Sequence, residues 1–262
     1  MPTSALHVAR TGLEAQNTRM QVIAHNLANI GTTGFKRDRA DFETLAYQDT
    51  RVAGQRSSGE TAYAVGLNLG TGVAVQGTSR IGTQGTLNTT GNALDLALDG
   101  DGFFQVELPG GQLGYTRAGN FTLSAEGQLV TPQGYAVQPA IEIPPGVQSV
   151  TVGPDGTVTA VLPGESAPAE LGQLTTATFA NPNGLRAQGS NFLVETAASG
   201  AAELDVAGTN GRGSVRQGML EASNVNVVEE LVEMIEAQRA YEINSKMISA
   251  VDEMLRNANQ TL

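Results

Sequence analysis

The side chains best suited to chemistry are two histidines and a short run of aspartates, and their spacing does not form a site. His7 and His25 are the only histidines, and eighteen helical residues at ~1.5 Å each place them about 27 Å apart. Zinc needs three or four converging ligands, so we expect no metal there. The aspartates between residues 95 and 101 fail the calcium-loop pattern, because Phe103 stands where an oxygen ligand is needed.

Other catalytic patterns are missing from the sequence. Gly208, Gly211 and Gly213 neither follow a predicted strand nor open a helix, so they are typical of a loop rather than a dinucleotide site. The sequence has no nucleophile elbow, no phosphate loop, no HExxH and no cysteine. We predict a protein that is not an enzyme and has no cofactor. A carboxylate pair brought together in space is the alternative that the sequence leaves open.

Composition excludes two classes of partner. The 262 residues carry a formal charge of -11, so the chain repels nucleic acid and anionic lipid. No apolar run approaches the roughly 18 residues that span a bilayer. Arg10, Glu14 and Arg19 interrupt the apolar residues of the first segment, and this argues against a cleaved signal peptide.

The charge is distributed unevenly between the two ends. Residues 1–39 hold five basic and two acidic side chains, for a charge of +3, whereas residues 221–262 hold three basic and eight acidic ones, for -5. Complementary charge favours pairing of the two terminal segments, within one chain or between neighbouring chains.

Both ends also carry a helical heptad pattern. We expect one helix from Thr3 or Ser4 to about Ile30, ended by a left-handed Gly31, and another from about Asn226 to Asn259, capped by Asn226. Apolar residues recur every seven positions in both segments, and this is typical of a coiled-coil seam. The seam residues are Leu6, Leu13, Met20 and Leu27 in the first segment, and Val227, Met234, Tyr241, Ile248 and Leu255 in the second.

The middle of the chain indicates β structure. Apolar and polar residues alternate at Leu94–Asp99, and turn signals stand at residues 109–111 and 153–156. Before this region, residues 47–68 are rich in Gly, Ser, Thr and Gln with little periodicity, and this predicts a long surface loop or an extended arm.

The predicted fold class is therefore α+β. Long N- and C-terminal helices pair as a coiled-coil stem, and an antiparallel β domain and an extended arm are inserted between them. We expect the helical domain at 1–30 and 224–262, a connecting segment at 31–75, and the β domain at 76–223. Packing of the seam between copies is favoured over a helix hairpin packed on the β domain, because the second apolar face is long and narrow.

Two long terminal segments and two shorter motifs in the middle of the chain are distinctive. The terminal segments read Asn26-Leu27-Ala28-Asn29-Ile30-Gly31-Thr32-Thr33-Gly34-Phe35-Lys36-Arg37 and Ser223-Asn224-Val225-Asn226-Val227-Val228-Glu229-Glu230-Leu231, the latter followed by Gln238–Lys246. The middle motifs are Gly100–Val106 and Tyr115–Phe121. The terminal segments resemble the signatures of the bacterial flagellar rod and hook protein family, and the middle motifs resemble that family's β-domain motifs.

The resemblance implies an axial structural subunit that polymerises into the hollow, rigid distal rod of the basal body and crosses the periplasm. It implies export without a cleaved signal through the flagellar type III apparatus, with no membrane insertion. The implied partners are other copies of the chain, the proximal rod protein, the hook protein, the P-ring and L-ring proteins and the rod cap. The alternatives are a proximal rod or hook protein and, from other classes, a secreted adhesin or a cell-wall hydrolase.

The resemblance also implies two groups of site residues besides the seam. One group is the signature turn after the first helix, and the other is an arm that braces neighbouring subunits and sets the stiffness of the rod. The turn residues are Asn26, Ala28, Asn29, Thr33, Gly34, Phe35 and Lys36, and the arm residues are Tyr47, Arg51, Arg56, Tyr63 and Leu67.

Overall fold

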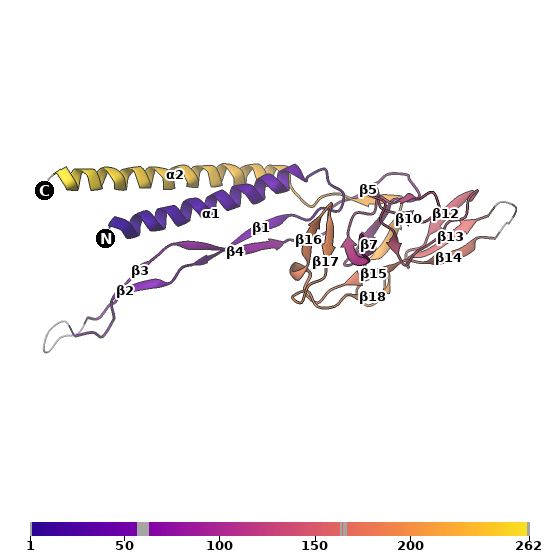
Figure 1. The fold of residues 1–262 in the computed structure, drawn as a ribbon, viewed down its shortest axis with the longest axis horizontal. Helices are drawn as coiled ribbons and strands as arrows, with labels where there is room; N and C mark the ends of the chain where they lie inside the picture. Colours follow the sequence, from indigo (N-terminus) through magenta and orange to yellow (C-terminus); the bar gives the residue numbers. More distant parts are fainter. Residues whose placement is uncertain (1, 57–62, 163, 165–166, 261–262) are drawn as a thin grey trace. The chain divides into compact units, whose positions relative to one another are not determined.

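The computed structural model describes the chain except for residues 1, 57–62, 163, 165–166 and 261–262 (Figure 1). The chain forms two compact units. The helical unit contains Met1–Ala28, Asp38–Ser79 and Asn226–Leu262, and the β unit contains Asn29–Arg37 and Arg80–Val225. The predicted connecting segment 31–75 is thus divided between the units. Its residues up to 37 belong to the β unit, and those from 38 onward belong to the helical unit.

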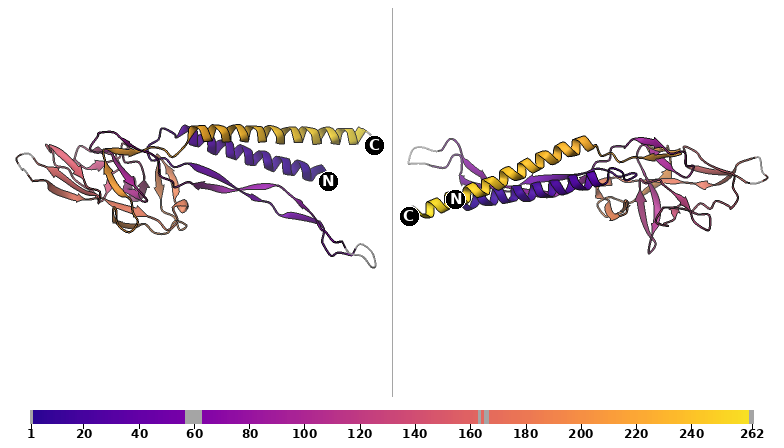
Figure 2. Two further views of the ribbon diagram at one scale, coloured as in Figure 1. Left: turned by 180° about the vertical axis from the view of Figure 1, so that it is seen from behind. Right: turned by 90° about the horizontal axis from the view of Figure 1, so that it is seen from above.

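Two antiparallel helices dominate the helical unit (Figures 1 and 2). Helix α1 spans Pro2–Ala28 and helix α2 spans Val227–Gln260. The predicted cap of α2 is confirmed, because the Asn226 side-chain oxygen accepts the Val228 N–H at 3.0 Å. The predicted stop of α1 at Gly31 is wrong. The helix ends at Ala28, and the left-handed residue of the following turn is Gly34, with φ at 66°.

The arm of the helical unit is a pair of two-stranded ladders. Strand β1 (Asp38–Thr44) pairs with β4 (Val73–Arg80), and β2 (Tyr47–Arg51) pairs with β3 (Leu67–Gly70). The predicted arm at 47–68 is therefore extended, as the sequence indicated, but it forms a hairpin. Its residues 57–62 lie outside the described part of the chain.

The β unit is built from antiparallel sheets. Its largest sheet joins seven strands in the order β16-β17-β8-β7-β15-β18, with β11 also paired to β7. A three-stranded sheet has the order β12-β13-β14, and β19-β6, β20-β5 and β10-β9 form two-stranded ladders. The bounds are β5 Leu87–Thr89, β6 Leu96–Asp99, β7 Phe103–Leu108, β8 Gln112–Thr116, β9 Thr122–Leu123, β10 Leu129–Val130, β11 Val137–Gln138, β12 Ser149–Val152, β13 Thr157–Val161, β14 Ala169–Gln173, β15 Thr175–Thr178, β16 Arg186–Gly189, β17 Phe192–Val194, β18 Glu203–Val206, β19 Ser214–Gln217 and β20 Met219–Glu221, with a 3-10 turn at Pro182–Gly184.

Local turn signals determine much of this topology. The glycines at 110 and 111 adopt positive φ between β7 and β8, and Gly156 does so between β12 and β13, so both predicted turns are confirmed. The core of the β unit gathers alternating apolar residues of these strands, among them Leu96, Leu98, Phe104 and Val106. The predicted α+β class with an antiparallel β part is confirmed.

Candidate functional site

Small and polar residues form the centre of the contact between α1 and α2. A Cβ added to Gly12 would lie 3.0 Å from the Asn244 side chain, so the helices approach closely there. Ala9 and Ala237 are buried in the same unit. Arg19 of α1 reaches Glu233 at 3.5 Å and Glu236 at 3.7 Å on α2. The two ends of complementary charge therefore do meet within one chain.

The predicted seam residues are only partly covered in a single chain. Val227 and Tyr241 are 40% and 41% exposed. The half-buried members are Leu6, Leu13, Met20, Leu27, Met234, Ile248 and Leu255. Their part in assembly thus stays a prediction.

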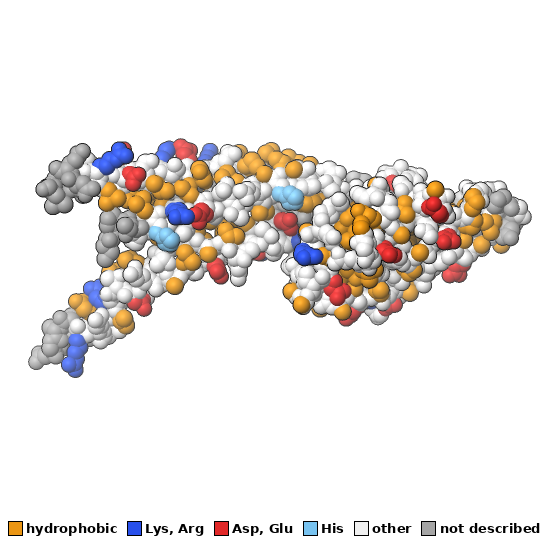
Figure 3. All heavy atoms as spheres, viewed as in Figure 1, with side chains coloured by type: hydrophobic (Ala, Val, Ile, Leu, Met, Phe, Trp, Pro, Cys, Tyr) orange, Lys and Arg blue, Asp and Glu red, His pale blue; other side chains and the backbone are white. Residues whose placement is uncertain are grey.

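A second apolar stripe on α2 was missed in the sequence analysis. Val228, Val232, Ile235, Ile243, Met247 and Met254 are all between 46% and 69% exposed in the single chain, and hydrophobic side chains gather along the helices in Figure 3. The signal that could have revealed this stripe is the spacing of Val232, Ile243 and Met254, which recur every eleven residues. We call these six residues the α2 stripe.

Asn26, the first residue of the signature turn, joins three segments of the helical unit. Its amide nitrogen donates to the Asp38 carbonyl at 2.8 Å and to the Glu230 carboxylate at 3.2 Å, while its oxygen accepts the Asp38 N–H at 2.9 Å. Asn26 and Glu230 are fully buried. The end of α1, the start of β1 and the first turn of α2 are therefore held together by one side chain.

From Asn29 onward, the signature turn belongs to the β unit. Gly34 must be glycine, because a Cβ there would lie 2.6 Å from the Arg117 backbone and its φ is 66°. The Gly34 N–H donates to the Glu221 carbonyl at 2.8 Å, and the Thr33 carbonyl accepts from the Asn191 side chain at 2.8 Å. Of the remaining predicted turn residues, Phe35 and Lys36 are buried, Asn29 is half-buried and Ala28, in the helical unit, is exposed.

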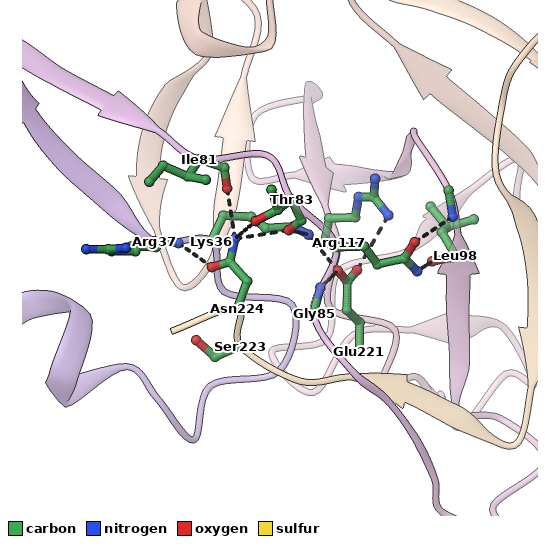
Figure 4. A network of polar contacts seen from close by, with 12 residues as sticks. Lys36, Arg37, Ile81, Thr83, Gly85, Leu98, Arg117, Glu221, Ser223 and Asn224 are labelled. Carbon is green, nitrogen blue, oxygen red and sulfur yellow. Dashed lines mark hydrogen bonds and ion pairs between the residues drawn. The ribbon is translucent and has the colours of Figure 1, made fainter. Parts of the chain in front are cut away.

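Lys36 enters a buried ionic network with Glu221 and Arg117 (Figure 4). Its ammonium donates to Glu221 Oε1 at 2.5 Å and to the Thr83 carbonyl at 2.9 Å. The Gly85 N–H donates to the same carboxylate at 2.9 Å, and a guanidinium nitrogen of Arg117 lies 3.5 Å from its other oxygen. The side-chain exposures of Lys36, Glu221 and Arg117 are 7%, 0% and 6%, so one carboxylate partners two buried cations.

Burial controls the electrostatics of this network. It lowers the pKa of the Lys36 ammonium from its usual 10.5, and the hydrogen bond from Lys36 to Glu221 offsets only part of that effect. Burial likewise lowers the pKa of the Arg117 guanidinium, against the attraction of Glu221. Glu221 and Arg117 were not among the predicted site residues. The available signal was a charged residue in the apolar run Met219-Leu220-Glu221.

Asn224 extends the network to the neighbouring segments. Its oxygen accepts the Arg37 N–H at 2.7 Å, and its amide donates to the carbonyls of Ile81 and Thr83 at 2.9 and 3.0 Å (Figure 4). The signature turn, the segment 81–85 and the segment 221–224 are thereby fixed to one another inside the β unit. We call Lys36, Arg117, Glu221 and Asn224 the junction network.

The arm residues are mostly exposed. Tyr47, Tyr63 and Leu67 are 63%, 37% and 43% exposed. The Arg51 guanidinium lies over the Tyr63 ring, 4.3 Å from its centroid, while Arg56 is exposed. The base of the arm is pressed on α1, because a Cβ at Gly72 would lie 2.2 Å from Thr11 Oγ1. The structure therefore brings together the ends of the arm and leaves most of its apolar residues uncovered.

Within the described residues no group of three or more His, Asp or Glu side chains could hold a metal ion. Across the same described residues, no helix is long and apolar enough to cross a membrane.

Family profiles match both terminal segments and the middle of the chain. Residues 6–36 match the flagella basal body rod protein profile, 97–160 the flagellar hook protein FlgE/F/G D1 domain, and 216–261 the flagellar basal body rod FlgEFG protein C-terminal profile. The first and last matches include Lys36 and Glu221. These matches place the chain in the class of flagellar rod and hook proteins.

Full-length relatives give a finer comparison. The chain is 49% identical to the flagellar basal-body rod protein FlgG of Buchnera aphidicola subsp. Acyrthosiphon pisum, over 98% of both chains. It is 45% identical to FlgG of Caulobacter vibrioides over 98% of both, and 36% identical to FlgF of the same species over 99% of this chain and 98% of that one. The chain belongs to the flagellar basal-body rod protein family. Within that family it is more similar to these FlgG proteins than to FlgF.

Proposed function

We propose that this chain is the structural subunit of the distal flagellar rod, and that it polymerises through its terminal helices into a stiff tube that transmits torque. The observation that carries the proposal is the α2 stripe, six apolar side chains that are about half exposed or more among the described residues. Scattered surface apolar residues are normal, but six of them on one side of a single helix indicate an interaction surface. The chemistry required is packing alone, and the relatives carry the names of rod proteins.

The helices offer two different faces for assembly. One face of α2 contacts α1 through Asn244 and Ala237, and the α2 stripe lies on another. The half-buried seam residues border the first contact. We therefore propose a coiled-coil-like arrangement between copies, with the seam closing the pair of helices and the α2 stripe packing on the next subunit. Each fully buried Val, Ile or Met side chain contributes roughly 1.5–3 kcal/mol.

The arm supplies stiffness in this proposal. A two-stranded hairpin alone is only marginally stable in water. The exposed apolar residues Tyr47, Leu67 and Leu69 therefore call for a second surface to cover them. A hairpin clamped between neighbouring subunits removes their freedom to slide. The bracing role of Tyr47, Arg51, Arg56, Tyr63 and Leu67 follows from this placement.

The test of the α2 stripe is Ile243→Asp. This side chain is 61% exposed, so the variant should fold as a monomer with unchanged helical circular dichroism. Polymerisation should fail, because each subunit contact would bury an unpaired carboxylate. The matched control is Gln238→Asp, at another exposed position of the same helix. Normal rods and motility with Ile243→Asp would refute the role of the stripe.

The test of the arm is deletion of residues 47–68. The Thr71 hydroxyl donates to the Ala46 carbonyl at 2.6 Å, so the flanking residues already lie side by side and the gap can close. Electron microscopy should show polymers that are flexible or curved. Rods as straight as wild type would contradict the bracing role.

The position of this chain in the flagellum is tested by electron microscopy of basal bodies from a strain that lacks the gene. We expect truncated rods without a hook. We propose the proximal rod and hook proteins, the ring proteins, the rod cap and the export apparatus as partners, and export without a cleaved signal. A complete rod that lacks only its hook would assign the chain to the hook instead.

A further inference from the structure

A cavity of about 280 Å³ opens in the β unit beside the junction network. Lys36, Arg80 and Arg117 contribute three cations to its lining, and Asp101 contributes one carboxylate. Glu221 is completely buried and already partners Lys36 and Arg117. These five side chains together carry an excess of positive charge, on a chain whose net charge is -11.

Arg117 has bonding capacity left over. Its side chain is 6% exposed, and its contact with Glu221 is long, at 3.5 Å. Its Nε is buried, and no acceptor in the described part of the chain bonds to it. A guanidinium presents five N–H donors in a planar fork that suits a carboxylate. An unsatisfied buried donor costs about 1–3 kcal/mol, and a carboxylate in the cavity would add negative charge beside this incompletely paired guanidinium.

The aromatic residues of the cavity lining indicate which chemical group carries the carboxylate. Phe103 and Phe179 pack edge to face with centroids 6.0 Å apart, and the Arg117 guanidinium carbon lies 5.5 Å from the Phe103 centroid. Both rings line the cavity. Cationic and aromatic side chains in one lining fit a carboxylate on a short apolar stem, which is the chemistry of an Asp or Glu side chain.

We propose that this cavity receives an acidic side chain from a second copy of the chain. The inference rests on the proposed polymer and adds a contact between β units to the helical ones. The occupant is inferred from charge complementarity. The chain as a whole is strongly acidic, so the carboxylates on the surface of a second copy suit a cationic cavity. Within the proposed polymer, the contact would be repeated from subunit to subunit as a heterologous contact, with the cavity on one copy and the inserted side chain on the next.

The experiment measures polymerisation and cavity occupancy separately. Arg80→Glu should raise the critical concentration for polymerisation at least about tenfold, equivalent to 1.4 kcal/mol. Arg80→Lys should keep it within about threefold of wild type. The matched control is Arg186→Glu on the exposed strand β16, outside the cavity. Circular dichroism verifies that each variant folds.

Sodium benzoate serves as a probe for the cavity in the full-length monomer, with benzamide as its neutral counterpart. Benzoate should shift the Arg117 Nε–H resonance and inhibit polymerisation, and benzamide should do neither. A Glu→Lys or Asp→Lys suppressor that restores polymerisation of Arg80→Glu would identify the inserted side chain.

Each outcome decides the proposal. If benzoate binds but Arg80→Glu polymerises normally, the cavity takes a free carboxylate and the second-copy occupant is overturned. If benzoate does not bind and Arg80→Glu polymerises normally, the inference fails while the proposed function stands. If the wild-type chain forms no polymer under any condition, both fail.

Discussion

Replacing Glu221 by glutamine tests whether the junction network holds the β unit together. The substitution preserves shape and an acceptor for the Gly85 N–H, but it removes the only charge that compensates Lys36 and Arg117 within the network. All three side chains are at most 7% exposed. Breaking a buried pair and leaving its partner charged costs about 3–5 kcal/mol. For a folded unit of 150–250 residues, roughly 2–4 °C is lost per kcal/mol, so Tm should fall by about 10 °C.

The assay is urea unfolding followed by the near-ultraviolet circular dichroism of tyrosine, because Tyr115 is buried in the β unit and the chain has no tryptophan. The matched control is Glu203→Gln. That side chain is 79% exposed and 3.9 Å from Arg212, so its loss should cost no more than about 1 kcal/mol. A double-mutant cycle with Lys36→Met should give a coupling energy of about 1–3 kcal/mol. A Glu221→Gln loss equal to that of the control would refute the reasoning.

Three further perturbations follow from the same contacts. Burial lowers the Lys36 pKa in the folded chain, so the unfolded chain binds more protons at pH values between that lowered pKa and 10.5. Across this pH window the free energy of unfolding of wild type, measured relative to Lys36→Met, should therefore rise with pH. A difference that does not change with pH would argue against a buried ammonium. Asn26→Ala removes the side chain that bonds to the backbone of Asp38, and this should lower the stability of the helical unit by about 2–4 kcal/mol. The measurement is urea unfolding followed by circular dichroism at the helical band. The control, Asn17→Ala on the exposed face of α1, should lower the stability by less than about 1 kcal/mol. Gly72→Ala places a Cβ 2.2 Å from Thr11 Oγ1 at a φ of 125°, so hydrogen exchange at the base of the arm should accelerate at least tenfold; unchanged protection would show that the arm is not seated on α1.

The sequence predicted those features whose determinants are local. The cap of α2 depends on Asn226 and the next two residues, and the β7–β8 turn depends on two adjacent glycines. Such signals act within a few residues and can be read without the rest of the chain. The order of the elements and the α+β class follow from the same kind of signal.

Features set by distant contacts were mistaken or missed. Gly31 fits the local pattern for a helix stop, but the left-handed position is Gly34, where the Arg117 backbone passes within 2.6 Å of where a Cβ would stand. The pairing of Lys36 with Glu221 spans 185 residues and leaves no local pattern. Helix α2 carries both a heptad and an eleven-residue repeat of apolar residues. The prediction used the heptad alone, so it included Val227 and Tyr241 and missed Ile243.

The sequence separation within the junction network has a consequence for the growing chain. Synthesis proceeds from the N-terminus, so Lys36 and Arg117 emerge long before Glu221, which stands 185 and 104 residues after them. A chain that stops between residues 117 and 221 contains both cations and lacks the carboxylate that pairs with them. The β unit can therefore close only when its last strand arrives. The stable fold of the β unit thus requires the chain to be complete through Glu221. Truncated copies cannot reach this fold, because Lys36 and Arg117 would be buried without their carboxylate partner.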